Sequence, residues 1–238
     1  MSATLIQQAP AAPTAHLEGE PERRITHHFG DRKLQTLSPD TLNAFYLEKF
    51  GMSPLPDAAK LLPSARNGFV PFTVRKGLTI NGTLAVLRKY SPGVRTADLP
   101  NPDDLEANFL SHDRKADRDY GFLFRDGIGP DMDLDNISAR QFWFDHPQAK
   151  GMTLLERMLI DLYMCWQTIK QGGDPHPSEA YLDWTMGACT ICAGTRDHDG
   201  NPAIMSFLIR CLGPGIHIGD QNRSARGTAV RRVLLLGD

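Results

Sequence analysis

The chain of 238 residues has few cysteines, no excess of either charge and no long hydrophobic run. Its four cysteines lie in the C-terminal third, and four thiols in a chain of this length do not form a disulfide scaffold. Lysine and arginine number 26 against 28 acidic residues, so the formal charge of −2 gives no field that would attract a nucleic acid. No apolar run approaches the roughly 18 residues needed to span a bilayer, and the N-terminus lacks a signal-peptide pattern. We therefore expect a cytoplasmic protein that binds neither nucleic acid nor membrane.

The chain is long enough for one sizeable core, and we expect one domain that follows an N-terminal arm. Residues 1–22 are rich in Ala, Pro, Gln and Glu and show no apolar periodicity. This composition predicts a disordered arm. Residues 23–238 are then expected to form a single compact domain.

Start and stop signals predict several helices. Ser38 is an N-cap residue followed by a proline suited to the first turn, which predicts a helix over 39–50. Thr153 and Glu156 match the T-x-x-E capping box ahead of an apolar stripe, and Gly172-Gly173 ends that helix. The same kinds of signal predict four further helices, at residues 54–66, 79–90, 102–112 and 202–212.

Residues 180–218 can be read in two ways. Residues 190–193 and 204–209 could be strands joined by a hairpin turn at Asp199-Gly200. We favour helices, because no polar alternation marks a half-buried strand and five residues fall on one helical stripe. That stripe consists of Tyr181, Trp184, Ala188, Cys192 and Thr195. The predicted fold is therefore mainly α, and an α+β fold with a C-terminal hairpin is the alternative.

An imidazole lies beside a carboxylate at His112-Asp113, within the charged run 108–121. A carboxylate can fix the tautomer of an imidazole and raise its basicity, which suits the pair to proton transfer or metal binding. Adjacent residues do not face each other on a helix, however, so a solvated helix end is the alternative. In that case an exposed charged face consists of Arg114, Lys115, Asp117, Arg118 and Asp119.

A resemblance to a known family comes from the run Asn108-Phe109-Leu110-x-His112-Asp113-x4-Arg118-Asp119-Tyr120-Gly121-Phe122. It resembles the Glu-His-Asp signature region of the haem-thiolate peroxidases, the chloroperoxidase and unspecific peroxygenase family. Gly68-Phe69-Val70-Pro71 and then Gly77-Leu78-Thr79-Ile80 are similar to the family's N-terminal region, in the same order. The resemblance spans about 58–215 and implies a helical fold like that of chloroperoxidase.

This resemblance implies a haem-dependent oxidoreductase of the peroxidase or peroxygenase type, acting on a small organic substrate. His112 would be the haem ligand or the group that moves protons, and Asp113 would orient it. The resemblance also places Ser111, Phe69 and Pro71 at the cofactor.

Three functional residues of the family are replaced in this chain. The proximal cysteine falls near Ala58, the glutamate of the triplet is Ser111, and the distal glutamate falls near Ala188. The alternative function is therefore a non-catalytic relative that binds a small molecule or a protein partner through the former haem pocket.

Zinc is the second cofactor to consider. Cys189-Thr190-Ile191-Cys192 has the C-x-x-C spacing with which two thiolates hold one zinc ion, which would make the chain a zinc-binding structural protein. The other ligands could come from Cys165, Cys211, His176, His198 or His217. Because Thr190 and Ile191 resemble core residues, two buried structural thiols are the alternative.

Overall fold

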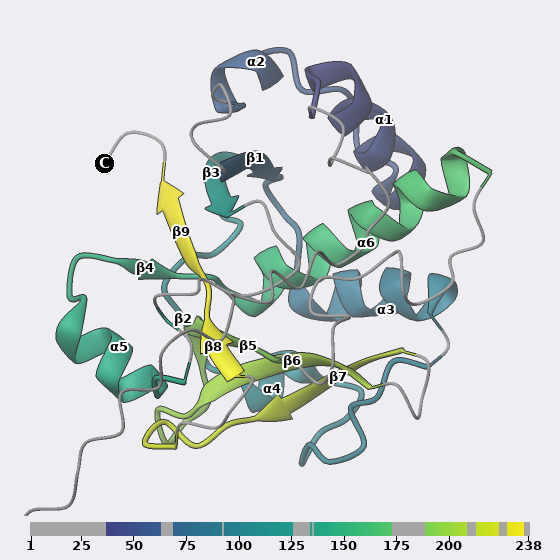
Figure 1. Cartoon of the computed structure of the whole chain (residues 1–238). Coiled ribbons are helices and arrows are strands. Elements are labelled where there is room, and N and C mark those ends of the chain that lie inside the picture. Colours follow the sequence, from purple (N-terminus) through teal and green to yellow (C-terminus); the bar gives the residue numbers. More distant parts are fainter. Residues whose placement is uncertain are drawn as a thin grey trace, which may run out of the picture. The chain divides into compact units, whose positions relative to one another are not determined.

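The computed structural model describes residues 37–62, 69–91, 93–125, 134, 136–172, 189–208, 213–223 and 228–235. They belong to one compact unit, Arg32–Asp238. Within the described ranges, six helices and nine strands form an α+β fold (Figure 1). The predicted mainly α fold is wrong, and the α+β alternative with a C-terminal hairpin is confirmed. The arm predicted for residues 1–22 lies outside the described residues.

Three predicted helices, over 39–50, over 79–90 and from Thr153 to Gly172, are confirmed, whereas the helix that begins at the N-cap Ser138 was not predicted. Ser38 and Thr79 each accept a hydrogen bond from a first-turn amide, and Thr153 forms the full capping box with Glu156. None of the described helices is long and apolar enough to cross a membrane. The helices are α1 (Pro39–Phe50), α2 (Ala58–Leu61), α3 (Ile80–Tyr90), α4 (Leu105–Asn108), α5 (Ala139–Asp145) and α6 (Leu154–Lys170).

The strands form two sheets. The first sheet has four antiparallel strands in the order β1 (Phe69–Val74), β3 (Tyr120–Arg125), β9 (Arg232–Leu235) and β4 (Lys150–Gly151). The second sheet has the antiparallel order β2 (Ser111–His112), β5 (Cys189–Arg196), β6 (Pro202–Leu208) and β7 (Gly213–Ile218). A short strand, β8 (Thr228–Val230), pairs in parallel with β5. Since β8 leads directly into β9, one segment connects the two sheets.

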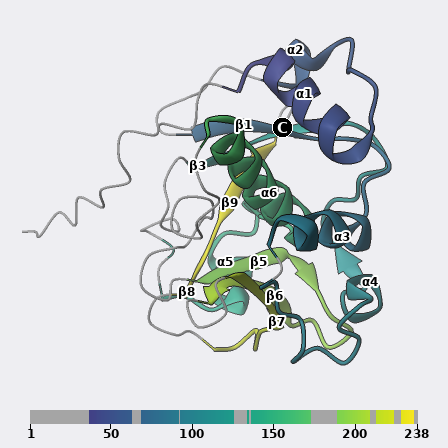
Figure 2. The same cartoon turned by 90° about the vertical axis from the view of Figure 1, so that its right-hand side faces the viewer.

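Helix α6 lies between the sheets and is buried on nearly all sides (Figures 1 and 2). It contacts β1 on one side, β5 and β6 on the other, and α3 along its length. A helix buried all round carries apolar residues on every face, and most of the buried residues of α6 are apolar. Glu156 at its start is completely buried, so this carboxylate requires partners from other elements.

Three of the predicted helices differ from the structure. The helix predicted over 202–212 is wrong, because residues 202–208 form β6. Asn201 does not cap a helix there; its amide nitrogen and side chain bond the carboxylate of Asp197 in the turn of the β5–β6 hairpin. The predicted helix 102–112 shortens to α4 followed by β2, and only Ala58–Leu61 of the predicted helix 54–66 is helical in the described residues.

Candidate functional site

A pocket of about 400 Å³ lies where the starts of α3 and α6 meet the segment that contains β2. Its volume is within the range of small-molecule sites. The lining combines buried apolar side chains with a half-buried imidazole and a guanidinium, and charged side chains are exposed at its edge. It consists of Gly77, Leu78, Thr79, Ile80, Glu106, Phe109, Leu110, His112, Arg114, Lys115, Ala116, Asp117, Thr153 and Leu155.

Both long helices at the pocket begin with a threonine that lines it. The Thr79 hydroxyl accepts a hydrogen bond of 2.9 Å from the amide of Gly82, and the Thr153 hydroxyl accepts one of 3.2 Å from the amide of Glu156. First-turn amides have no partner within their own helix, and their aligned dipoles give a helix start a partial positive charge. The first turn of α3 contains no acidic residue that would compensate this charge.

A buried ion pair lies next to the pocket. The Arg114 guanidinium donates from Nε to Oε1 of Glu156 and from Nη2 to Oε2, both at 2.7 Å. The same carboxylate accepts hydrogen bonds from the Tyr120 hydroxyl at 3.0 Å and from the Thr153 amide at 2.7 Å. These four bonds occupy the acceptor positions of the carboxylate, so Glu156 acts as a fixed support for Arg114.

The third nitrogen of the Arg114 guanidinium, Nη1, does not contact Glu156. Nη2 also donates to the carbonyl of Gly151 at 2.6 Å, whereas buried Nη1 has no hydrogen-bond partner among the described residues. The side chain is only 9% exposed, and burial alone would lower its pKa. The charge of Glu156 more than offsets burial and raises the pKa of Arg114, so the guanidinium is charged. A buried, charged donor without an acceptor is unfavourable until a ligand or water supplies one.

Burial also shifts the pKa of Tyr120, which bonds Glu156, and of His112, which lines the pocket. Burial and the charge of Glu156 raise the pKa of Tyr120, so its hydroxyl is a hydrogen-bond donor at neutral pH. Burial, Lys115 and Arg196 lower the pKa of His112 from its usual 6.5. The imidazole is therefore mainly neutral at neutral pH.

The structure separates the partners in the predicted His112-Asp113 pair. Nδ1 of His112 lies 3.2 Å from the hydroxyl of Thr195 on β5. The Asp113 carboxylate instead forms an ion pair with Arg196, and its amide donates to the carbonyl of Gly194 at 2.8 Å. His112 lines the pocket, while Asp113 anchors the strand that carries it.

Two glycines bring β4 and β5 close enough to position the start of α6. A Cβ atom on Gly194 would lie 2.6 Å from the carbonyl oxygen of Gly151, which a real side chain does not tolerate. At this approach the Gly194 amide donates to the carbonyl of Met152 at 3.1 Å. The Thr195 hydroxyl, which faces His112, also accepts a 3.0 Å bond from the amide of Leu154.

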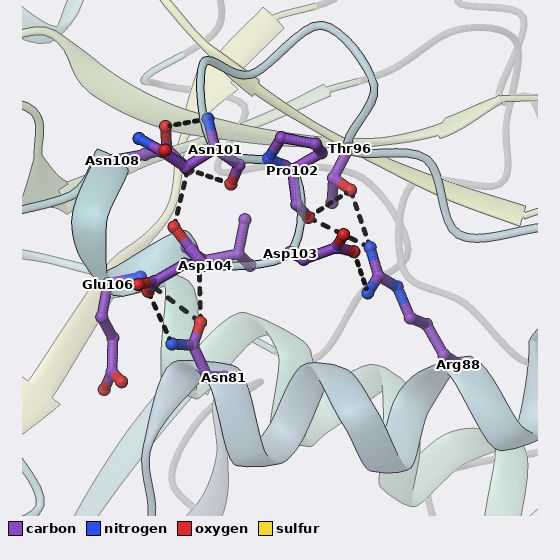
Figure 3. A network of polar contacts seen from close by, with 10 residues as sticks. Asn81, Arg88, Thr96, Asn101, Pro102, Asp103, Asp104, Glu106 and Asn108 are labelled. Atoms are coloured by element: carbon purple, nitrogen blue, oxygen red, sulfur yellow. Dashed lines mark hydrogen bonds and ion pairs between the residues drawn. The ribbon is translucent and has the colours of Figure 1, made fainter.

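A polar network fixes the other wall of the pocket (Figure 3). Asn81 on α3 accepts a 2.7 Å hydrogen bond from the amide of Leu105 and donates one of 2.7 Å to Asp104, so it holds the start of α4. Arg88, further along α3, donates to Asp103 and to the carbonyl of Pro102. These bonds fix α4, which carries Glu106, and the chain that continues to Phe109.

The residues assigned to haem by the family resemblance do not come together. Phe69 and Pro71 lie on β1 in the first sheet, and neither lines the pocket. Ser111 is exposed on β2 of the second sheet, so only His112 of this set reaches the pocket. In the part of the chain that the structure describes, these residues do not fit a haem site.

The two cysteines of the C-x-x-C motif lie on one strand, β5. Side chains alternate between the faces of a strand, so residues three apart point to opposite sides. Cys189 and Cys192 therefore cannot hold one zinc ion together in this conformation. Among the described residues, one group could hold a metal ion, Asp197, His198 and Asp199, and it contains no cysteine.

Sequence reasoning missed the residue that distinguishes this pocket. Arg114 was assigned to an exposed charged face, whereas its side chain is almost completely buried against Glu156. Glu156 was recognised only as a capping residue. No local signal marks the pair, because its two residues are 42 positions apart.

Comparisons with known proteins provide no assignment for this site. The chain matches no family model, no curated protein and no solved structure. The arrangement of the pocket residues therefore provides the argument for function.

Proposed function

We propose that the protein binds a small ligand in this pocket through an acceptor oxygen that is hydrogen-bonded to Nη1 of Arg114. The observation that carries this proposal is the buried Nη1, which lacks a hydrogen-bond partner among the described residues. Neighbouring protein atoms cover Nη1, so these atoms must move aside when a ligand enters, while Glu156 keeps the guanidinium itself in place. Small-molecule binding was also the alternative function that the sequence suggested if the chain is not a peroxidase.

Oxidoreductase activity is not part of the proposal. It depended on a helical haem-peroxidase fold and on cofactor residues that converge on one cavity. The fold is α+β, and Phe69 and Pro71 lie away from the pocket.

The test compares two substitutions of arginine by lysine. Arg114→Lys keeps a positive charge beside Glu156 but removes the planar fork and its Nη1 donor. Arg140→Lys is the matched control, because Arg140 is exposed on α5, bonds Asn222 and lies outside the pocket lining. The probes are octanoate and octanamide, which share an acceptor oxygen and an eight-carbon chain, and binding is measured by isothermal titration calorimetry.

We expect at least one probe to bind the wild type and Arg140→Lys, with at least tenfold weaker binding to Arg114→Lys. Circular dichroism of both variants checks that they are folded. If neither probe binds the wild type, or if folded Arg114→Lys binds as tightly as Arg140→Lys, the proposal is wrong.

A further inference from the structure

We propose that the hydrogen bond between His112 and Thr195 is an acid-sensitive contact, which holds β2 to β5 while the imidazole is neutral and releases β2 when the imidazole takes up a proton. The segment around β2 forms part of the pocket wall, since Leu110 and His112 both line the pocket. Release of β2 would therefore open this wall at acidic pH. The contact is independent of the binding function proposed above, and its test needs no ligand.

Thr195 determines which nitrogen of His112 carries a hydrogen. Its side chain is completely buried, and Oγ1 has two hydrogen-bond partners, the Leu154 amide at 3.0 Å and Nδ1 of His112 at 3.2 Å. An amide nitrogen can only donate, so Nδ1 is the acceptor for the hydroxyl hydrogen in the part of the chain that the structure describes. Buried hydroxyl groups are nearly always hydrogen-bonded. Neutral His112 therefore accepts at Nδ1 and carries its hydrogen on Nε2.

Proton uptake then takes place at the nitrogen that already accepts a hydrogen bond. A proton on Nδ1 turns this nitrogen into a donor, so the Thr195 hydroxyl has to accept from both Nδ1 and the Leu154 amide. The hydroxyl hydrogen is left without an acceptor among the described residues, and a buried donor without a partner is unfavourable. Protonation of His112 is therefore disfavoured as long as β2 stays against β5.

The surroundings of the imidazole act in the same direction. The groups that shift its pKa lie on the segment around β2 and on β5. Burial, Lys115 and Arg196 lower the pKa, whereas the Phe109 backbone and the Asp113 carboxylate raise it, and the net effect is a lowered pKa. The other carboxylates near the pocket are screened or paired: Glu106 and Asp117 are exposed to solvent, and Glu156 at the start of α6 is bonded to Arg114.

Strand β2 is short, so few bonds hold it in place. It consists of two residues, Ser111 and His112, which pair with the end of β5. The Asp113 amide adds a 2.8 Å bond to the carbonyl of Gly194, and the ion pair of Asp113 with Arg196 is partly exposed. A short edge strand opens at a lower free-energy cost than the core. An imidazole released into water regains its ordinary affinity for a proton, so acid favours the released state.

The experiment uses the full chain and measures the position of the hydrogen and the strength of the β2–β5 contact separately. NMR spectra that correlate the ring nitrogens of His112 with its carbon-bound hydrogens show which nitrogen is protonated at pH 7.5. Hydrogen exchange of the Asp113 amide is measured at pH 7.5 and pH 5.5, as a protection factor that corrects for the intrinsic effect of pH. The Ser91 amide, which bonds the Leu87 carbonyl at the end of α3, is the internal reference.

We expect the hydrogen on Nε2 at pH 7.5. Relative to the Ser91 amide, the protection factor of the Asp113 amide should be at least about threefold lower at pH 5.5, with about tenfold as the limit one unit below the ordinary pKa of histidine. His112→Asn removes the titrating ring, so this fall should disappear. His198→Gln, which replaces an exposed histidine outside the pocket lining, should keep it.

The proposal is wrong if Nδ1 carries the hydrogen at pH 7.5, a result that the wild type alone can give. It is also wrong if the Asp113 amide is unprotected at pH 7.5, or if its protection does not fall at pH 5.5. An equal fall in folded His112→Asn and in the wild type would show that another group causes the release.

Discussion

Arg114 and Glu156 are 42 positions apart in the sequence, yet their side chains form a bidentate ion pair with two contacts of 2.7 Å. The pair connects the segment after β2 to the first turn of α6 and is shielded from solvent on both sides. Breaking a buried pair leaves one charge without compensation, which costs more than the pair itself contributes to stability. The pair therefore fixes the position of the Arg114 side chain, which lines the pocket.

Replacing Glu156 with glutamine should destabilise the protein strongly. Glu156→Gln keeps the size of the side chain and its ability to cap α6, but it leaves the Arg114 charge buried without a carboxylate. We expect the free energy of unfolding to fall by about 3 kcal/mol, measured by urea denaturation. Glu106→Gln, at an exposed position of α4, is the control and should change stability by less than about 0.5 kcal/mol. Equal effects of the two substitutions would show that the ion pair is not important for folding.

Substitution by valine should lower the stability of the protein at one buried threonine, Thr195, but not at another, Thr83. The Thr195 hydroxyl accepts from the amide of Leu154 and lies beside His112, so Thr195→Val leaves a buried N–H without its acceptor. This should cost about 1–3 kcal/mol. The hydroxyl of Thr83 on α3 is buried with no hydrogen-bond partner among the described residues, so Thr83→Val should be neutral or stabilising. Thermal unfolding of the two variants gives the comparison, and a loss of stability in Thr83→Val equal to that in Thr195→Val contradicts it.

The sequence predicted those parts of the fold that local interactions determine. Helices α1, α3 and α6 begin at a serine or threonine whose side chain bonds its own first turn, and such caps can be read from three or four adjacent residues. Strand β5 could not be read in this way. It is buried along almost its whole length, so it lacks the polar alternation that marks a half-buried strand. Its partners β2 and β8 come from distant parts of the chain.

The pocket was predictable only in part, for the same reason. His112 was identified as a candidate from its own neighbourhood, and it does line the pocket. The role of Arg114 depends on Glu156, and the approach of β4 to β5 depends on Gly151 and Gly194. These contacts join residues about 40 positions apart, so no local pattern in the sequence indicates them.

A side chain at Gly194 should disrupt the approach of β4 to β5. The Cβ atom of Gly194→Ala would lie 2.6 Å from the backbone oxygen of Gly151, and backbone cannot move aside without separating the strands. Gly219→Ala is a matched control, because its Cβ atom would also lie 2.6 Å from its nearest neighbour, here the end of the flexible Ile204 side chain. We expect Gly194→Ala to cost at least about 2 kcal/mol and Gly219→Ala clearly less, measured by urea denaturation. If Gly219→Ala lowers the free energy of unfolding more than Gly194→Ala does, the explanation is wrong.

The imidazole of His112 should make stability depend on pH in a defined interval. Burial, then the charges of Lys115 and Arg196, lower its pKa below the usual 6.5 in the folded protein. Between the folded and unfolded pKa values the unfolded chain binds more protons, so stability falls as the pH drops below about 6.5 and is unaffected by this group at higher pH. Urea denaturation at pH 7.5 and pH 5.5 should therefore show a larger loss for the wild type than for His112→Gln. The control is His198→Gln, which replaces an exposed histidine outside the pocket lining. If His112→Gln and the wild type lose the same amount, another group causes the dependence, and His112 is not held in its neutral form by the pocket.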